Sequence, residues 1–184
     1  LFALKNDDIP QVVGIITHNK FLGVLIDLAC LSFGIRVIPI PKNSTPENIS
    51  YIINHSDINN LFIGDRESAQ KWMEIKHQHE IQTIALDYNK NKLMDITNWD
   101  QFLKNGDNLE KFDSDALMNE VSIQDIQTIM YTSGTTANPK GIVFNNLHII
   151  SKRFARALAL PQVSSDDTFL CYLPLFHTFG RYFE

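Results

Sequence analysis

A run of small, hydroxylated residues that ends in a lysine is the part of this sequence best suited to chemistry. The run occupies residues 131–141 and consists of Tyr-Thr-Ser-Gly-Thr-Thr-Ala-Asn-Pro-Lys-Gly. Gly134 permits backbone conformations that let amide groups converge on an anion, and Lys140 adds a mobile positive charge. Further hydrogen bonds can come from the hydroxyl groups of Thr132, Ser133, Thr135 and Thr136. These residue types in this order predict a loop that binds the phosphates of a nucleotide.

The run differs from the phosphate-binding loops of other common nucleotide-binding folds. The P-loop pattern G-x-x-x-x-G-K-[ST] needs a second glycine where Pro139 stands, and here Gly141 follows the lysine instead. The sequence holds no G-x-G-x-x-G, and no G-x-S-x-G surrounds Ser133. A P-loop phosphotransferase is kept as an alternative because it makes a distinct prediction, a helix that begins at Lys140.

Histidines are the other side chains that could take part in chemistry. His177 follows a Pro-Leu-Phe run and lies among aromatic residues, so both a site histidine and a packed, hydrogen-bonded one fit its surroundings. His77 and His79 have H-x-H spacing, which without further ligands favours a solvated helix end over a metal site.

Alternating short β-rich runs and longer helical runs must position these residues. Strands are expected at residues 12–16, 36–40, 60–63, 81–86, 126–131, 141–145 and 168–173. Helices are expected at residues 20–33, 46–55, 66–77 and 147–160, with Ser44 or Thr45 capping the second and Asn145 or Asn146 the last. This alternation predicts an α/β fold, a doubly wound and mostly parallel sheet with helices on both faces. Ligands of such sheets bind at the carboxyl ends of strands, where the run after Tyr131 lies.

Two segments carry more specific expectations. The helix at 20–33 is apolar nearly all round, which predicts that it is deeply packed. The segment 89–120 is polar and weakly patterned, which indicates a short helix and long connections.

Composition excludes several classes of protein. The chain has 184 residues, 44% hydrophobic and 20% charged, with a net charge of -5 and no basic stripe, so nucleic acid is not an expected partner. The longest apolar stretch, 21–33, contains Asp27 and is too short to span a bilayer. Cys30 and Cys171 lack metal-type spacing and are expected to be buried thiols, consistent with a reducing cytoplasm. A cytoplasmic location is expected, with peripheral membrane contact left open.

Two motifs resemble the adenylate-forming, or AMP-binding, superfamily of acyl-CoA synthetases, peptide-synthetase adenylation domains and luciferases. Residues 131–141 resemble its signature [ST]-[ST]-G-T-T-G-x-P-K-G, with Ala137 where glycine is common. Residues 172–181 are similar to a second motif in which Pro-Leu-x-His follows a strand. Arg181 fits the long-chain acyl-CoA synthetases, whereas Gly180 replaces their usual glutamate. A softer similarity covers residues 25–54.

The resemblance implies an enzyme that joins a carboxylate to ATP and passes the acyl group to coenzyme A. It implies Mg²⁺ as a cofactor, with the Thr132 hydroxyl as a candidate ligand, and a fatty acid as the carboxylic acid substrate. His177 would lie near the carboxylate and acyl entrance. The ATP phosphates would be bound by Thr132, Ser133, Gly134, Thr135, Thr136, Lys140 and Gly141.

Later motifs of the superfamily, including the ribose-binding aspartate and the catalytic lysine, are not found in residues 1–184. We therefore expect an incomplete N-terminal AMP-binding domain that is inactive by itself. An adenylation domain of a peptide synthetase and a non-catalytic nucleotide-binding module of the same fold remain alternatives. The aromatic residues Phe176, Phe179, Tyr182 and Phe183 suit an apolar acyl group or a core equally well, and Arg181 could be ion-paired or on the surface.

Overall fold

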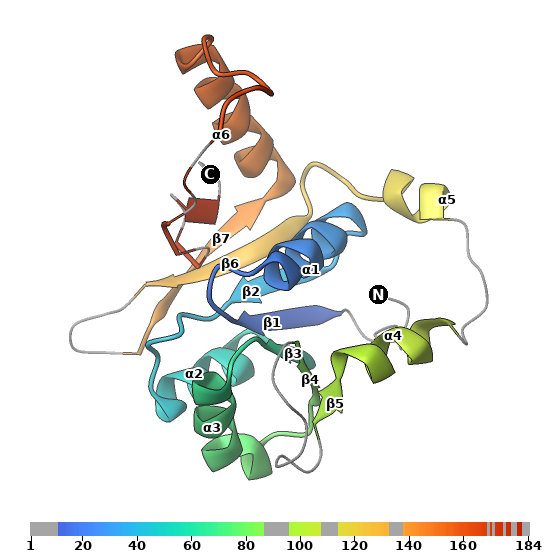
Figure 1. Ribbon diagram of the computed structural model, residues 1–184, viewed down its shortest axis with the longest axis vertical. Coiled ribbons are helices and arrows are strands. Elements are labelled where there is room, and N and C mark those ends of the chain that lie inside the picture. The colour runs from blue at the N-terminus through green and yellow to red at the C-terminus, as the bar shows by residue number, and fades with distance from the viewer. Residues whose placement is uncertain are drawn as a thin grey trace.

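A seven-stranded sheet forms the centre of the computed structural model (Figure 1). The structure describes residues 11–86, 96–107, 114–132, 138–168, 170, 172–174, 176–177 and 180–181. The strands are β1 (Val12–Ile16), β2 (Arg36–Pro39), β3 (Asn60–Ile63), β4 (Gln82–Ala85), β5 (Thr97–Asn98), β6 (Ile126–Thr132) and β7 (Lys140–Asn145). Their order is β5-β4-β3-β1-β2-β6-β7, and every neighbouring pair is parallel except β6 with β7.

Helices cover both faces of this sheet. The helices α1 (Phe21–Ser32) and α4 (Trp99–Asp107) pack on one face, and α2 (Pro46–His55) and α3 (Arg66–Ile75) pack on the other (Figure 1). A short 3₁₀ turn, Lys76–Gln78, extends α3, and α5 (Ser114–Asn119) and α6 (Asn146–Ala159) complete the described helices. The predicted doubly wound α/β fold is confirmed.

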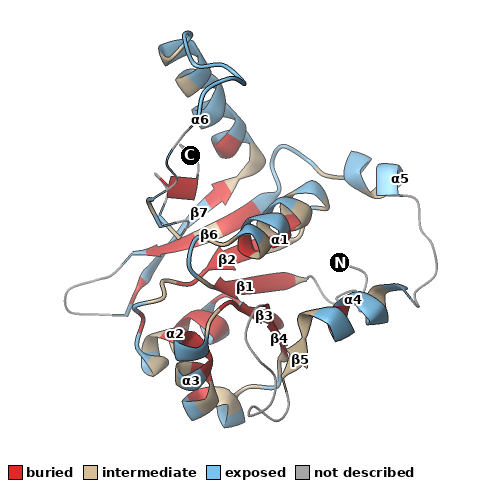
Figure 2. Cartoon of the chain, in the orientation of Figure 1, coloured by how far each residue is buried: buried red, intermediate tan, exposed pale blue. Residues whose placement is uncertain are grey.

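The two faces of the sheet are made by alternate residues along each central strand. Val13 and Phe62 belong to the cluster beneath α1 and α4, whereas Val12 and Leu61 belong to the cluster beneath α2 and α3. Because parallel strands with helices on both sides bury both of their faces, their sequences are continuously apolar rather than alternating. Figure 2 shows the buried residues concentrated along these central strands.

Side-chain caps fix where the helices begin. The Thr45 hydroxyl accepts the Asn48 amide at 3.3 Å, with Pro46 in the first turn. The Asp65 carboxylate accepts the Ser68 amide at 3.0 Å, and the Asn145 side chain accepts the His148 amide at 2.9 Å. The predicted caps at Thr45 and Asn145 are confirmed, since each satisfies an amide that the helix itself leaves unpaired.

The expected deep burial of the 20–33 helix is wrong. Only Gly23, Ile26 and Cys30 of α1 are buried, and Leu28 on the outer face is 52% exposed. A helix on one face of a sheet buries only the stripe that contacts the strands, and apolar residues elsewhere on α1 stay at the surface. Cys30 is fully buried, which confirms the prediction of a buried thiol there, and this burial raises the pKa of the thiol to about 12. Cys171 lies outside the described residues.

The segment before His177 and the segment 89–120 also differ from expectation. No strand forms at the described residues between 168 and 173, where Leu170 and Tyr172 are exposed and lack the burial that stabilises a strand. Two helices, α4 and α5, form in the 89–120 segment where one short helix was predicted. Phe102 anchors α4 by packing edge-on against Phe62 at 5.4 Å between ring centroids. Among the described residues, none of the helices is long and apolar enough to cross a membrane.

Candidate functional site

The predicted phosphate loop connects the two antiparallel strands at one end of the sheet. β6 ends at Thr132 and β7 begins at Lys140, and these two residues lie directly opposite each other. Opposed residues of an antiparallel pair point to the same face, so the exposed side chains of Thr132 and Lys140 flank the base of the loop together. Their contact is a long hydrogen bond, from the Thr132 hydroxyl to the Lys140 carbonyl oxygen at 3.4 Å. Ser133, Gly134, Thr135 and Thr136 lie outside the described residues.

The strand that begins at Lys140 decides against one alternative. A P-loop requires a helix to open at the lysine, so that the helix N-terminus faces the phosphates. Here Lys140 and Gly141 are the first residues of β7, paired with β6 over six register positions. The P-loop phosphotransferase is therefore excluded.

Tyr131 fixes the strand end from which the loop emerges. Its hydroxyl lies 2.7 Å from His55 Nδ1 and 2.6 Å from Ser56 Oγ, at the end of α2. Burial raises the pKa of the Tyr131 phenol, which the hydrogen bond with Ser56 opposes. Gly141 lies opposite, where a Cβ atom would stand 2.7 Å from a methyl carbon of Ile129. The sequence did not predict this anchor, because Tyr131 and His55 are 76 residues apart in the chain.

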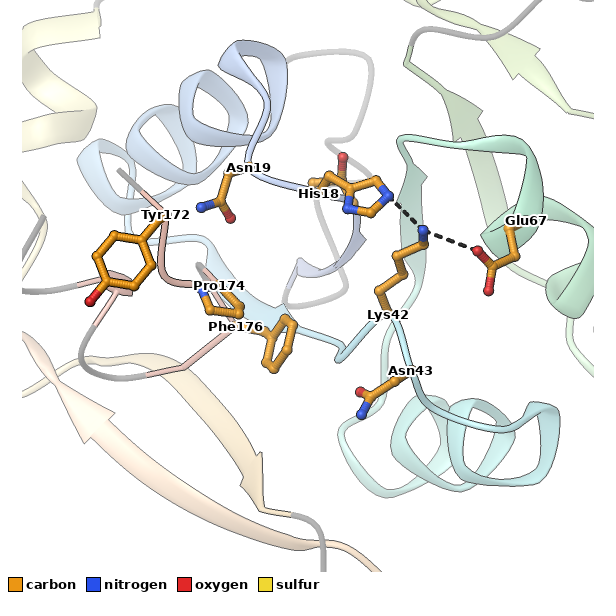
Figure 3. Close-up of a pocket in the computed structure, with 9 residues that line it drawn as sticks. His18, Asn19, Lys42, Asn43, Glu67, Tyr172, Pro174 and Phe176 are labelled. Carbon is orange, nitrogen blue, oxygen red and sulfur yellow. Dashed lines mark hydrogen bonds and ion pairs between the residues drawn. The ribbon is translucent and has the colours of Figure 1, made fainter. Parts of the chain in front are cut away.

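A cleft of about 570 Å³ opens at the carboxyl ends of β1, β2 and β3 (Figure 3). This is the edge at which a doubly wound sheet binds ligands. Figure 3 shows three residues of the His177 region on one side of the cleft and a network around Lys42 on the other. The cleft is lined by Thr17, His18, Asn19, Lys42, Asn43, Glu67, Tyr172, Pro174 and Phe176.

The Lys42 network gives one wall of the cleft fixed charges. Lys42 Nζ lies 3.0 Å from Glu67 Oε2 and donates a hydrogen bond to His18 Nε2. Lys71 Nζ also contacts Glu67, at 3.3 Å, and it donates to the Lys42 carbonyl oxygen. The hydrogen bonds from Lys42 and Lys71 lower the pKa of Glu67. No motif in the sequence indicates this network, whose members come from the loops after β1 and β2 and from α3.

His177 lies on a tight turn beside the cleft. Its amide donates to the Pro174 carbonyl oxygen at 2.9 Å, its carbonyl oxygen accepts the Arg181 amide at 3.0 Å, and its side chain is exposed. Gly180 belongs to the same turn, and a Cβ atom there would lie 2.6 Å from the Pro174 carbonyl oxygen. The turn in this chain therefore has no room for a side chain at position 180. Phe176 lines the cleft, while Phe179, Tyr182 and Phe183 lie outside the described residues.

Arg181 is a buried ion-pairing residue. Its guanidinium donates to both carboxylate oxygens of Asp27, from Nε at 2.8 Å and also from Nη2, and its side chain is only 3% exposed. Nη1 donates to the Thr128 hydroxyl, which itself donates to the Val37 carbonyl oxygen at 2.6 Å. The open choice between an ion-paired and a surface role is thus decided by the tertiary structure.

In the H-x-H pair after α3, His77 is exposed, whereas His79 is held by packing. The His79 ring stacks on Trp72 with 5.6 Å between centroids, and its Nε2 lies 2.9 Å from Ser50 Oγ. Burial lowers the pKa of His79. Within the ranges that the structure describes, no group of three or more His, Cys, Asp and Glu residues is close enough to hold a metal ion.

Comparison with known proteins identifies relatives of this chain. Long chain acyl-CoA synthetase 2 of Arabidopsis thaliana is 31% identical over 170 residues, which cover 85% of this chain and 25% of that protein. Long-chain-fatty-acid--CoA ligase ACSBG2 of Rattus norvegicus is 27% identical over 90% of this chain and 26% of its own length. The chain thus spans about a quarter of the length of these relatives.

Solved structures share the fold at lower identity. A red-emitting luciferase from Phrixothrix hirtus superposes with a TM-score of 0.74 at 20% identity, covering 94% of this chain and 33% of the luciferase. The o-succinylbenzoate CoA synthetase of Bacillus subtilis, solved with an acyl-adenylate intermediate, gives a TM-score of 0.63 at 20% identity, covering 94% of this chain and 39% of the synthetase. The sequence profile of the AMP-binding enzyme family matches residues 5–184. This match extends over the β6–β7 hairpin and the His177 turn alike, and the chain belongs to the AMP-binding enzyme family.

Proposed function

We propose that the complete protein activates a carboxylic acid with ATP, forming an acyl-adenylate and pyrophosphate, and then transfers the acyl group to the thiol of coenzyme A. The observation that carries this proposal is the β6–β7 hairpin, which presents Thr132 and Lys140 side by side at the base of the predicted phosphate loop. Family membership and the acyl-CoA synthetases among the relatives support it. In this proposal the chain supplies the N-terminal part of the large AMP-binding domain.

The proposed roles follow from where charge develops. As a carboxylate attacks the α-phosphorus of ATP, negative charge accumulates on the phosphate oxygens and on the leaving pyrophosphate. In this proposal the exposed Lys140 ammonium and the Thr132 hydroxyl are the groups that bind the β- and γ-phosphates. Bound Mg²⁺ would neutralise part of the same charge. The Thr132 oxygen is of the hard donor type that this ion prefers, so Thr132 is our candidate protein ligand.

A fatty acid is the substrate that we propose. The relatives named above as long-chain acyl-CoA synthetases support this class. The exposed His177 lies on a turn whose neighbour Phe176 lines the cleft, so polar and apolar groups adjoin there. We propose that His177 stands at the carboxylate entrance.

Carboxylate-dependent exchange of labelled pyrophosphate into ATP tests the function in the complete protein. We expect exchange with fatty acids across a series of chain lengths and none without a carboxylic acid. Exchange supported by amino acids alone would instead indicate a peptide-synthetase adenylation domain. No exchange with any carboxylic acid would contradict the proposal and favour a non-catalytic nucleotide-binding module.

Replacing the loop lysine tests the site. Lys140→Ala should slow exchange by about a hundredfold, the scale seen when one transition-state donor is removed. The matched control is Lys104→Ala, which removes an exposed lysine from α4 next to the opposite edge strand, β5. Equal rates for the Lys140 variant and the wild type would refute the phosphate role of Lys140.

A further inference from the structure

The buried guanidinium of Arg181 joins three elements that are distant in the sequence. It pairs with Asp27 on α1, 154 residues away, and donates to Thr128 on β6, 53 residues away. The Thr128 hydroxyl continues the chain of hydrogen bonds to the Val37 carbonyl oxygen of β2. A bidentate hydrogen bond to a carboxylate fixes the plane of the guanidinium, so the contact sets the orientation of the Arg181 side chain as well as pairing its charge.

The same residue terminates the turn that carries His177. The Arg181 amide donates to the His177 carbonyl oxygen at 3.0 Å, one helical turn away. At the other end of this turn, Asn19 Nδ2 donates to the Leu173 carbonyl oxygen at 2.6 Å. The turn is therefore attached at two points, through Asn19 to the loop before α1 and through Arg181 to α1 and β6, and the attachment through Arg181 is the buried one.

Thr128 connects the Arg181 attachment to the β6–β7 hairpin. It lies on β6, three residues before Tyr131 and four before Thr132, the last residue of that strand. A rigid strand thus separates the Arg181 contact from the base of the loop. Phe176 and Arg181 also share the lining of a small cavity of about 30 Å³ with Asp27, so the turn packs closely on α1.

We propose that Arg181 is a positioning residue, which fastens the His177 turn to α1 and β6 and thereby sets the place of His177 relative to the phosphate loop. The part of this inference that concerns substrate rests on the proposed function. A buried ion pair adds little net stability over apolar packing, whereas loss of one partner leaves an uncompensated charge. The Arg181–Asp27 pair is therefore better suited to fixing the position of the turn than to adding stability.

Hydrogen–deuterium exchange of the complete protein tests the fastening without reference to activity. Arg181→Lys keeps the charge but loses the planar fork, and Asp27→Asn removes the carboxylate charge. In both variants we expect peptides that cover residues 172–181 to exchange at least about tenfold faster, with peptides from α2 and β3 unchanged. The control is Arg153→Lys, the same change at an exposed position on α6. Unchanged exchange at 172–181, or an equal rise in all peptides, would overturn the inference.

Pyrophosphate-exchange kinetics then separate positioning from a purely structural role. We expect Arg181→Lys to raise the KM for the carboxylic acid by about tenfold while the KM for ATP and the melting temperature change little. A lower melting temperature with an unchanged KM would show a structural role only and would refute positioning. A wild-type protein without pyrophosphate exchange would contradict the proposed function, and deuterium uptake would still decide whether Arg181 fastens the turn.

Discussion

At the scale of single residues, the phosphate loop depends on how Tyr131 is held. Its phenol is shared between His55 and Ser56, and Ser56 is itself buried. We predict that Tyr131→Phe lowers the free energy of unfolding by about 1–3 kcal/mol, because it leaves a buried hydroxyl without a partner. Urea unfolding followed by circular dichroism measures this change.

A tyrosine at the surface provides the control for the Tyr131→Phe variant. Tyr172→Phe removes the same phenolic oxygen from a side chain that is largely exposed, so the midpoint of unfolding should stay near the wild-type value. If Tyr131→Phe and Tyr172→Phe behave alike, the hydrogen bonds of Tyr131 do not anchor the end of β6.

At the scale of elements, one cap links β7 to α6. The Asn145 side chain accepts the His148 amide, while His148 Nδ1 accepts the Asn145 amide at 3.3 Å, which completes a capping box. We predict that Asn145→Ala destabilises the protein by about 1 kcal/mol, the usual cost of losing an N-cap. The shift in the denaturation midpoint at constant slope reports this cost.

Restoring the cap should restore the stability. Asn145→Asp keeps an oxygen that can accept the His148 amide and places a negative charge at a helix N-terminus, which is favourable. An aspartate variant as unstable as the alanine variant would show that Asn145 acts through other contacts, such as its 3.4 Å hydrogen bond to Gln124.

At the scale of the whole molecule, α6 is largely exposed (Figure 2) and carries several large apolar side chains at the surface. Leu147, Ile150, Phe154 and Leu158 recur at helical spacing and are all exposed, Phe154 by 66%. A contiguous apolar stripe of this kind promotes association. We predict that the isolated 184-residue chain self-associates with rising concentration and that Phe154→Glu shifts it toward the monomer, as measured by sedimentation velocity.

The control for this surface is a charge placed elsewhere on the same helix. Ala159→Glu adds an equal charge at an exposed position away from Phe154, about 140° round α6, and should leave the association as it is in the wild type. An equal effect of both substitutions would attribute the change to net charge and would rule out the apolar stripe as the cause.

How far the sequence predicts this structure depends on the range of the interactions involved. Thr45 and Asn145 were predictable caps because each bonds to an amide three residues away. The strand at Lys140 followed from the local order of residues after Pro139. The strand expected at 168–173 was not found at its described residues, because apolar composition alone does not supply a neighbouring strand to pair with.

By itself, the sequence determined the α/β alternation, the ends of most elements and the composition of the phosphate loop, since these depend on propensities and contacts within a few residues. Only the tertiary structure decided that Thr132 and Lys140 stand opposite each other, that Tyr131 is held by α2, and that Arg181 is buried against Asp27. These contacts join residues that are 8 to 154 positions apart. Local preferences do not specify them, because such pairs meet only when the sheet brings its elements together.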